Sequence, residues 1–208
     1  GSMFTALFPP RDLSHGRGQS KNETIMTLAS AVTAIRLAVT LYFAMAAFSS
    51  LSWSPVLYAI VAYWLGDILD GLVARLTHRE TVIGAIFDIA ADRLSAIIIY
   101  MLLIQLLPSL ALPIMIYLVG FAIIDTILSM SFLKFHILSI NYFYLVDEDI
   151  YRWNWSVVAK ALTSSAFLLI TIMVQQPVIS LVVAIAICGV KMYSLRRLQH
   201  VLADHDAV

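Results

Sequence analysis

Six apolar stretches, each long enough to cross a bilayer, constrain the fold of this chain more than any other feature of its sequence. A helix needs about 20 apolar residues to cross ~30 Å of hydrocarbon. The stretches cover residues 27–48, 54–76, 82–107, 113–133, 156–174 and 178–198. The third, fourth and sixth lack the polar face at a 3.6-residue period that a helix in a soluble bundle would need. We therefore predict an all-α integral membrane protein with six transmembrane helices.

The composition agrees with this class. Hydrophobic residues make up 61% of the chain and charged residues 12%, whereas a soluble domain carries about 25% charged residues. The formal net charge is zero and by itself says little about partners. We expect no nucleic-acid partner. The single cysteine, Cys188, lies inside an apolar stretch and cannot form an intramolecular disulfide.

The distribution of Lys and Arg predicts the orientation. The connections expected on the outer side, 49–52, 108–111 and 175–177, contain neither residue. All basic residues lie on the other side or in the helix halves nearest to it. The positive-inside rule then places both termini and the loops near 77–81 and 134–155 in the cytoplasm.

The chain is expected to hold one membrane domain. We assign residues 27–200 to a six-helix catalytic domain, residues 1–26 to an N-terminal segment and residues 201–208 to a tail. The N-terminal segment fits either an interfacial piece or a cytoplasmic tail.

Four carboxylates in the second and third stretches form the candidate site: Asp67, Asp70, Asp88 and Asp92. Charged side chains within a membrane segment are costly and usually mark function. The first pair is spaced i, i+3 and the second i, i+4, so each pair lies on one helix face. The short turn at 77–81 makes the two helices antiparallel neighbours and leaves Asp70 and Asp88 each about 10 Å from it. We therefore expect the four acids to meet.

Carboxylates that meet repel one another unless cations compensate them. Two divalent cations would cancel four negative charges, and oxygen ligands favour Mg²⁺, Mn²⁺ or Ca²⁺ over zinc. Such a site suits phosphoryl transfer. The small residues Gly71, Ala74 and Gly84 leave room for a bulky ligand, and the Arg75 guanidinium suits a phosphate.

These two stretches contain the pattern Asp67-x2-Asp70-Gly71-x2-Ala74-Arg75-x8-Gly84-x3-Asp88-x3-Asp92. The pattern resembles the signature of the CDP-alcohol phosphotransferases, also called CDP-alcohol phosphatidyltransferases, at all eight defining positions. The resemblance implies that a CDP-linked donor transfers its phospho-alcohol group to a hydroxyl acceptor and releases CMP. It also implies a homodimer.

The resemblance implies a role for each position of the pattern. Asp67, Asp70 and Asp88 correspond to ligands of Mg²⁺ or Mn²⁺, two ions per site. Asp92 corresponds to a residue near the second ion and to the general base that takes the proton of the acceptor hydroxyl. The positions that correspond to residues around the CDP group are Gly71, Ala74, Arg75 and Gly84.

The first stretch contains a further matching element. Thr33-x2-Arg36 resembles an element found near the nucleotide in small lipid-synthesising members of the family. The match implies that Thr33 and Arg36 lie beside the nucleotide. Ser30 departs from the element, because those members often carry Asn at this position.

The fifth stretch resembles part of phosphatidylglycerophosphate and cardiolipin synthases at Lys160-x2-Thr163, although Leu162 replaces a polar residue of that element. Lys160, Thr163 and the nearby Arg152 are therefore candidate contacts for the acceptor. Lys160 also fits a side chain that simply extends to the membrane interface.

Small six-helix members of the family are mostly phosphatidyltransferases, so the implied donor is CDP-diacylglycerol, drawn from membrane lipid. The implied location is the inner (plasma) membrane, with the site facing the cytoplasm. Glycerol 3-phosphate and phosphatidylglycerol are the first acceptor candidates, and inositol phosphate, inositol and serine stay open.

The alternatives from other classes are a cation or proton transporter, since buried acids also line ion paths, and a silent binding homologue.

One acid has no assigned role. Asp125 stands alone in the stretch 113–133. We expect it to pair with a basic side chain such as Arg36 or Lys160.

Overall fold

The computed structural model describes residues 27–77 and 80–206, except for the side chains at positions 74, 75, 77, 205 and 206. Within these ranges every regular element is a helix, which confirms the all-α class. The described residues divide into two compact units. The first runs up to Leu102 and includes His136–Ser139, and the second contains Leu103–Phe135 and the residues from Ile140 onwards. The segment 1–26 lies outside the described residues.

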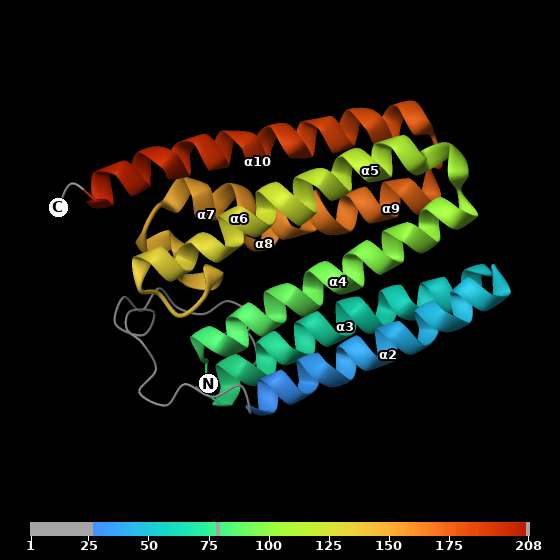
Figure 1. Cartoon of the computed structure of the whole chain (residues 1–208), viewed down its shortest axis with the longest axis horizontal. Coiled ribbons are helices and arrows are strands. Elements are labelled where there is room, and N and C mark those ends of the chain that lie inside the picture. Colours follow the sequence, from blue (N-terminus) through green and yellow to red (C-terminus); the bar gives the residue numbers. More distant parts are fainter. Residues whose placement is uncertain (1–26, 78–79, 207–208) are drawn as a thin grey trace. The chain divides into compact units, whose positions relative to one another are not determined.

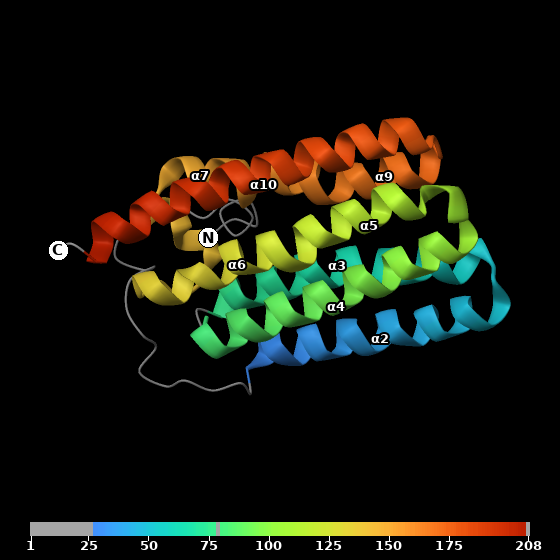
Figure 2. The same ribbon diagram turned by 45° about the horizontal axis from the view of Figure 1, so that its top comes forward.

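Three long helices build the first unit: α2 (Leu28–Ser50), α3 (Trp53–Thr77) and α4 (Val82–Leu106). Figures 1 and 2 both show them side by side. α2 begins where the Thr27 hydroxyl accepts a hydrogen bond from the Ser30 N–H at 3.0 Å, as an N-cap does. It ends at Leu51, whose φ of 50° turns the chain directly into α3.

Large and small apolar side chains together fill the interior of the first unit, where Ile99 and Leu102 are fully buried. Buried alanines lie on its three helices, and small side chains of this kind allow helices to pack closely in a membrane. The alanines are Ala44, Ala47, Ala59, Ala91 and Ala96. This packing places the polar faces of the three helices at one common level, where the candidate site lies.

The second unit contains more broken helices. Its elements in order are η1 (Pro108–Leu110), α5 (Ala111–Val119), η2 (Gly120–Ile124), α6 (Asp125–Met130), η3 (Ser131–Phe135), η4 (Ile140–Leu145), α7 (Glu148–Asn154), α8 (Val157–Lys160), η5 (Ala161–Ser165), α9 (Ala166–Met173) and α10 (Pro177–Asp206). Two of them, η2 and η5, are π-helical turns. Figure 1 shows α10 running along α5.

Aromatic rings form the core of the second unit. The rings of Tyr117 and Phe167 stack with centroids 4.1 Å apart and join α5 to α9. Phe143 and Trp155 lie 4.7 Å apart and join η4 to the residues after α7. A Cβ at Gly120 would lie 2.5 Å from the sulfur of Cys188, so the glycine allows α10 to pass close to the η2 turn.

The segment predicted as a loop over 134–155 contains helix α7. The Asp147 side chain caps it by accepting a hydrogen bond from the Ile150 N–H at 2.8 Å, and Arg152 lies in its last turn. The Arg197 Nε donates to both Asp147 oxygens, at 2.9 and 3.0 Å, and ties α10 to this cap. Hydropathy alone missed α7 because its stability comes from capping and charge rather than from apolar length.

The other boundaries also shift. The helical stretch predicted over 113–133 extends from Pro108 to Phe135, and the last helix continues to Asp206, beyond the predicted limit at 198. The domain limit expected at residue 200 therefore falls inside α10.

Five helical stretches of the described chain are long and apolar enough to cross a membrane. They are Leu28–Ser50, Trp53–Val73, Pro108–Phe135, Glu148–Met173 and Pro177–Asp204. α4, which corresponds to the predicted third span, is not among them. It has 25 residues and carries Asp88, Asp92 and Arg93.

Asp125 pairs with a basic side chain, as predicted, but this partner is Lys191 and neither of the two suggested residues, Arg36 and Lys160. The Asp125 and Lys191 side chains are only 8% and 6% exposed and join α6 to α10. A charge in an apolar interior needs a partner of opposite sign. Because α10 packs against α6, Lys191 is placed beside Asp125 as this partner.

Candidate active site

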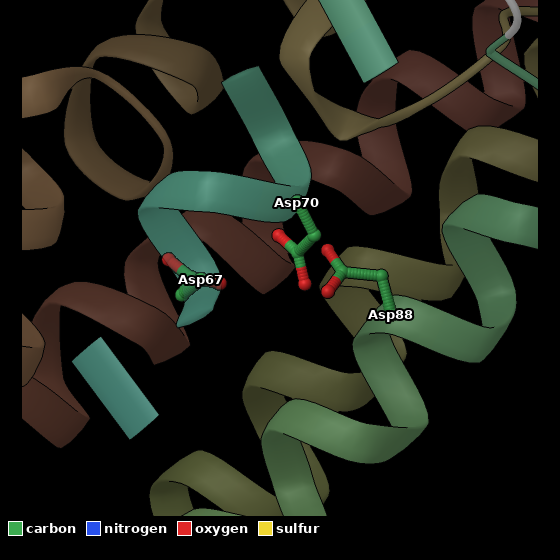
Figure 3. A group of neighbouring side chains, drawn as sticks. All are labelled: Asp67, Asp70 and Asp88. Carbon is green, nitrogen blue, oxygen red and sulfur yellow. The ribbon is translucent and has the colours of Figure 1, made fainter. Parts of the chain in front are cut away.

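Three of the four predicted acids converge in the first unit. Asp67 and Asp70 on α3 and Asp88 on α4 each place one carboxylate oxygen within 4.8 Å of the others. Figure 3 shows the carboxyl groups of Asp70 and Asp88 facing one another between the two helices. The i, i+3 spacing on α3 and the short connection to α4 account for this convergence.

The start of α4 is fixed close to the site. The Thr81 hydroxyl accepts a hydrogen bond from the Gly84 N–H at 3.0 Å, as an N-cap does. A Cβ at Gly84 would lie 2.8 Å from the Thr81 hydroxyl and 3.6 Å from that of Ser30 on α2. The tight contact of such a Cβ is therefore with the N-cap of α4 itself, which the glycine leaves undisturbed. Asp88 follows one turn after Gly84.

Arg36 of α2 lies at the centre of the acid group. Its Nη1 is 3.2 Å from Asp67, its Nη2 is 3.0 Å from Asp88 and its Nε is 3.4 Å from Asp70. The Arg36 side chain is 1% exposed, whereas those of Asp67 and Asp88 are 47% and 43% exposed. One planar, buried guanidinium thus contacts three carboxylates, a geometry that the point charge of a lysine cannot reproduce.

A glycine makes room for this arginine. A Cβ on Gly66 would overlap the Cβ, Cγ and Cδ atoms of Arg36. The Arg36 side chain therefore crosses α3 at a glycine, directly before Asp67. The guanidinium carbon of Arg36 also lies 5.9 Å from the ring centroid of Tyr63, on the same helix as Gly66, within the range of a cation–π contact.

Thr33 supports the buried acid. It lies one turn before Arg36 on α2, and its hydroxyl donates to Asp70 Oδ2 at 2.9 Å. The Asp70 side chain is 5% exposed. Thr33 and Arg36, both expected beside the nucleotide, are therefore directed at the carboxylates.

Asp92 has different partners. Its Oδ1 accepts a hydrogen bond from the Tyr63 hydroxyl at 2.6 Å, and its Oδ2 lies 3.3 Å from Arg93 Nη1. Asp92 is not part of the group formed by Asp67, Asp70 and Asp88. The structure thus divides the four acids into a group of three and one acid with its own surroundings.

The arginines change the charge count of the site. The four acids carry four negative charges, and Arg36 and Arg93 lie within ion-pair distance of them. The remaining charge of two negatives is what one divalent cation would balance. A second divalent cation therefore suits the site best when a ligand with its own negative charge is present.

The group of three acids fits a divalent metal ion. Oxygens bound to one Mg²⁺ lie up to about 4.2 Å apart, because each is about 2.1 Å from the ion. In the structure one carboxylate oxygen of each of the three acids lies within 4.8 Å of the other two. Small side-chain rotations would bring these oxygens to the spacing that one ion needs. Asp67 and Asp88 are the accessible members of the group, so an ion can approach them from the side opposite to Arg36.

The residues expected around the CDP group lie on the same two helices. Gly71 follows Asp70 on α3, and Gly84 lies one turn before Asp88 on α4. The backbone positions of Ala74 and Arg75 belong to α3, but their side chains lie outside the described part of the chain.

The acceptor candidates belong to the second unit. Arg152 lies on α7 and Lys160 at the end of α8, and both are exposed. Thr163, in the η5 turn, donates its hydroxyl to the Ala159 carbonyl at 2.7 Å. They share no element with the acids.

Sequence reasoning missed Gly66 and Tyr63. Gly66 directly precedes Asp67, and Tyr63 lies one turn before it. Their positions on the acidic face of the helix were a usable hint, because residues three and four apart share a face. Their partners on α2 and α4 were not visible in the sequence.

The family model described as CDP-alcohol phosphatidyltransferase matches residues 26–195. The match covers all four acids, the described residues of the first unit and the second unit up to residue 195. No curated protein and no solved structure matches the chain at a significant level.

Proposed function

Because the chain belongs to the CDP-alcohol phosphatidyltransferase family, we propose that it transfers a phosphatidyl group from CDP-diacylglycerol to a hydroxyl acceptor and releases CMP. The observation that carries this proposal is the convergence of Asp67, Asp70 and Asp88 within 4.8 Å of one another. An all-oxygen group of this kind is suited to the divalent ions used in phosphoryl transfer.

The proposed step follows from the residues at the site. Asp92 takes the proton of the acceptor hydroxyl as its oxygen attacks the phosphorus next to the diacylglycerol. The bond from that phosphorus to the CMP oxygen breaks, and CMP carries the electron pair away. A general base placed in this way contributes about 10²–10⁴-fold to a rate.

Asp67, Asp70 and Asp88 would hold the first divalent ion, and Asp92 together with the donor diphosphate would complete the site of a second. When bound, Mg²⁺ or Mn²⁺ would neutralise charge on the entering and leaving oxygens. Gly71, Ala74, Arg75 and Gly84 are proposed to surround the CDP group. Thr33 and Arg36 support the nucleotide through the carboxylates that they contact.

For the acceptor we propose glycerol 3-phosphate or phosphatidylglycerol, with Lys160, Arg152 and Thr163 as its contacts. The support is the resemblance at Lys160-x2-Thr163 and the need of a phosphate for a positive partner. We also propose a homodimer, from the resemblance alone.

Metal-dependent CMP release tests the function. The pure protein in detergent or liposomes, given CDP-diacylglycerol, Mg²⁺ or Mn²⁺ and one acceptor at a time, is expected to release CMP with glycerol 3-phosphate or phosphatidylglycerol. Excess EDTA is expected to abolish the release, because the carboxylates cannot bind the diphosphate without cations. Added Mg²⁺ or Mn²⁺ should restore it.

A matched substitution controls for the loss of an acid. Asp204→Asn removes an exposed carboxylate at the far end of α10 and should release CMP at the native rate. Full CMP release in excess EDTA would contradict the metal mechanism. Metal-dependent ion flux in liposomes without any CMP release would favour a transporter instead.

We propose six membrane spans with both termini and the site on the cytoplasmic side of the plasma membrane. α4 would be the sixth span, since its 25 residues extend about 37 Å at 1.5 Å per residue. Its charged half would face the acid group and Arg36 rather than lipid. The support for the orientation is the absence of Lys and Arg from the three outer connections.

Cysteine labelling in intact cells tests this orientation. Cys188→Ala removes the single cysteine of the chain, and Ser52→Cys or Thr77→Cys then adds one label site. A membrane-impermeant maleimide should label Ser52→Cys from outside and Thr77→Cys only after the cells are opened, because the two positions would lie on opposite sides of the bilayer. The reverse pattern would overturn the orientation.

A further inference from the structure

Tyr63 contacts both Asp92 and Arg36, the arginine that pairs with the group of three acids. Its hydroxyl donates to Asp92 Oδ1 at 2.6 Å, within the range of hydrogen bonds from a hydroxyl to a charged oxygen. The residue is 7% exposed, so water competes little for this hydrogen bond. It lies one turn before Asp67 on α3 and contacts an acid on α4 that the group of three does not include.

The ring of Tyr63 is fixed as well as its hydroxyl. The guanidinium carbon of Arg36 lies 5.9 Å from the ring centroid, and the same guanidinium holds Asp67, Asp70 and Asp88. Tyr63 therefore contacts the residue that organises the three acids and also the fourth acid. A shift of its ring would therefore change its contact with Arg36 and its hydrogen bond to Asp92.

A general base needs one oxygen aimed at the proton that it removes. With Oδ1 of Asp92 bound to the Tyr63 hydroxyl, the carboxylate cannot rotate freely about its Cβ–Cγ bond. Its Oδ2 accepts a hydrogen bond from Arg93 Nη1 at 3.3 Å, and the second lone pair of this oxygen is the one left for the acceptor proton. Groups held in this way lose less freedom on reaching the transition state.

From this geometry we propose that Tyr63 is a positioning residue for the transfer reaction: its hydroxyl fixes the Asp92 carboxylate so that Oδ2 receives the acceptor proton. This inference rests on the proposed phosphatidyl transfer and adds a residue outside the signature pattern. The acceptor O–H bond breaks and an Oδ2–H bond forms, while Tyr63 keeps its own proton and its hydrogen bond to Oδ1.

Tyr63→Phe removes the hydroxyl and keeps the ring beside Arg36. We expect kcat for CMP release to fall about 10–100-fold, the range for a hydrogen bond to a charged group. The KM values for donor and acceptor, and the CDP affinity measured by calorimetry with Mg²⁺, should stay at native values. Tyr58→Phe is the matched control, because it removes a hydroxyl from a 56% exposed tyrosine on the same helix and should leave kcat unchanged.

A double substitution separates positioning from general damage. If Tyr63 acts through Asp92, Tyr63→Phe should cause no further loss of kcat in the Asp92→Asn background. An equal further loss there, a native kcat for Tyr63→Phe, or a weakened CDP affinity would each overturn the inference. Failure of the proposed function gives a different result, since the native protein itself would then release no CMP in the presence of Mg²⁺ or Mn²⁺.

Discussion

Asp92→Asn is expected to lower kcat for CMP release by about 10²–10⁴-fold, the usual contribution of a general base. The same variant should bind CDP with Mg²⁺ at close to native affinity. Asparagine keeps the shape of the side chain and one oxygen that can accept the Tyr63 hydroxyl, but it cannot take a proton. Because Asp92 lies outside the group of Asp67, Asp70 and Asp88, its loss leaves the site of the proposed first ion intact. The amide oxygen of asparagine has a second lone pair that can still face the proposed second ion.

Asp70→Asn is the informative comparison. The Asp70 carboxylate is 5% exposed and is held by Arg36 and by the Thr33 hydroxyl. An amide there removes one of the three negative charges that converge on the proposed ion. We therefore expect this variant to lose both CMP release and CDP–Mg²⁺ binding.

Calorimetry with CDP and Mg²⁺, run beside CMP release, measures both quantities for both variants. An active Asp92→Asn, together with an Asp88→Asn that binds normally but releases no CMP, would assign the base to Asp88. Native binding and native turnover in Asp92→Asn and Asp70→Asn would place the active site elsewhere.

Arg36→Met is expected to abolish CMP release and to lower the thermal midpoint of the protein in detergent. The Arg36 side chain is 1% exposed and pairs with three carboxylates. Its removal leaves these acids facing one another without their shared partner. Breaking a buried ion pair costs about 3 kcal/mol at the lower end of the known range, which is the relevant end because Asp67 and Asp88 are part-exposed.

Gly66→Ala tests the same arrangement without changing any charge. The added methyl group would overlap the Arg36 side chain, and overpacking of this kind costs about 1–3 kcal/mol. We expect a lower midpoint and a large loss of CMP release. Gly189→Ala is the matched control, since a Cβ there meets nothing within 4 Å and alanine is the better helix former.

Thermal unfolding followed by fluorescence, together with CMP release, measures these variants. Arg36→Lys should rescue the midpoint in part but not the activity, because an ammonium cannot form the three-way contact of the guanidinium. If Arg36→Met and Gly66→Ala keep native midpoints and native CMP release, the arginine does not organise the acid group.

The sequence by itself determined the membrane class, the approximate position of most helices and the convergence of three of the four acids that it predicts to meet. These features depend on local patterns. The apolar length of a stretch predicts a span, and the i, i+3 spacing of Asp67 and Asp70 fixes their shared face whatever surrounds the helix. The short connection between α3 and α4 then brings Asp88 to the same level.

The tertiary structure alone decided the partners of these groups. Arg36 lies 31 positions from Asp67 and 52 from Asp88 along the chain, and no spacing rule relates them. Helix rotation and close packing brought it among the acids, through the space left by Gly66. The same packing paired Asp125 with Lys191 instead of the basic residues that the sequence suggested. A buried charge takes the partner that the packed helices place nearest to it, and this choice is set by the fold as a whole rather than by any segment of the sequence.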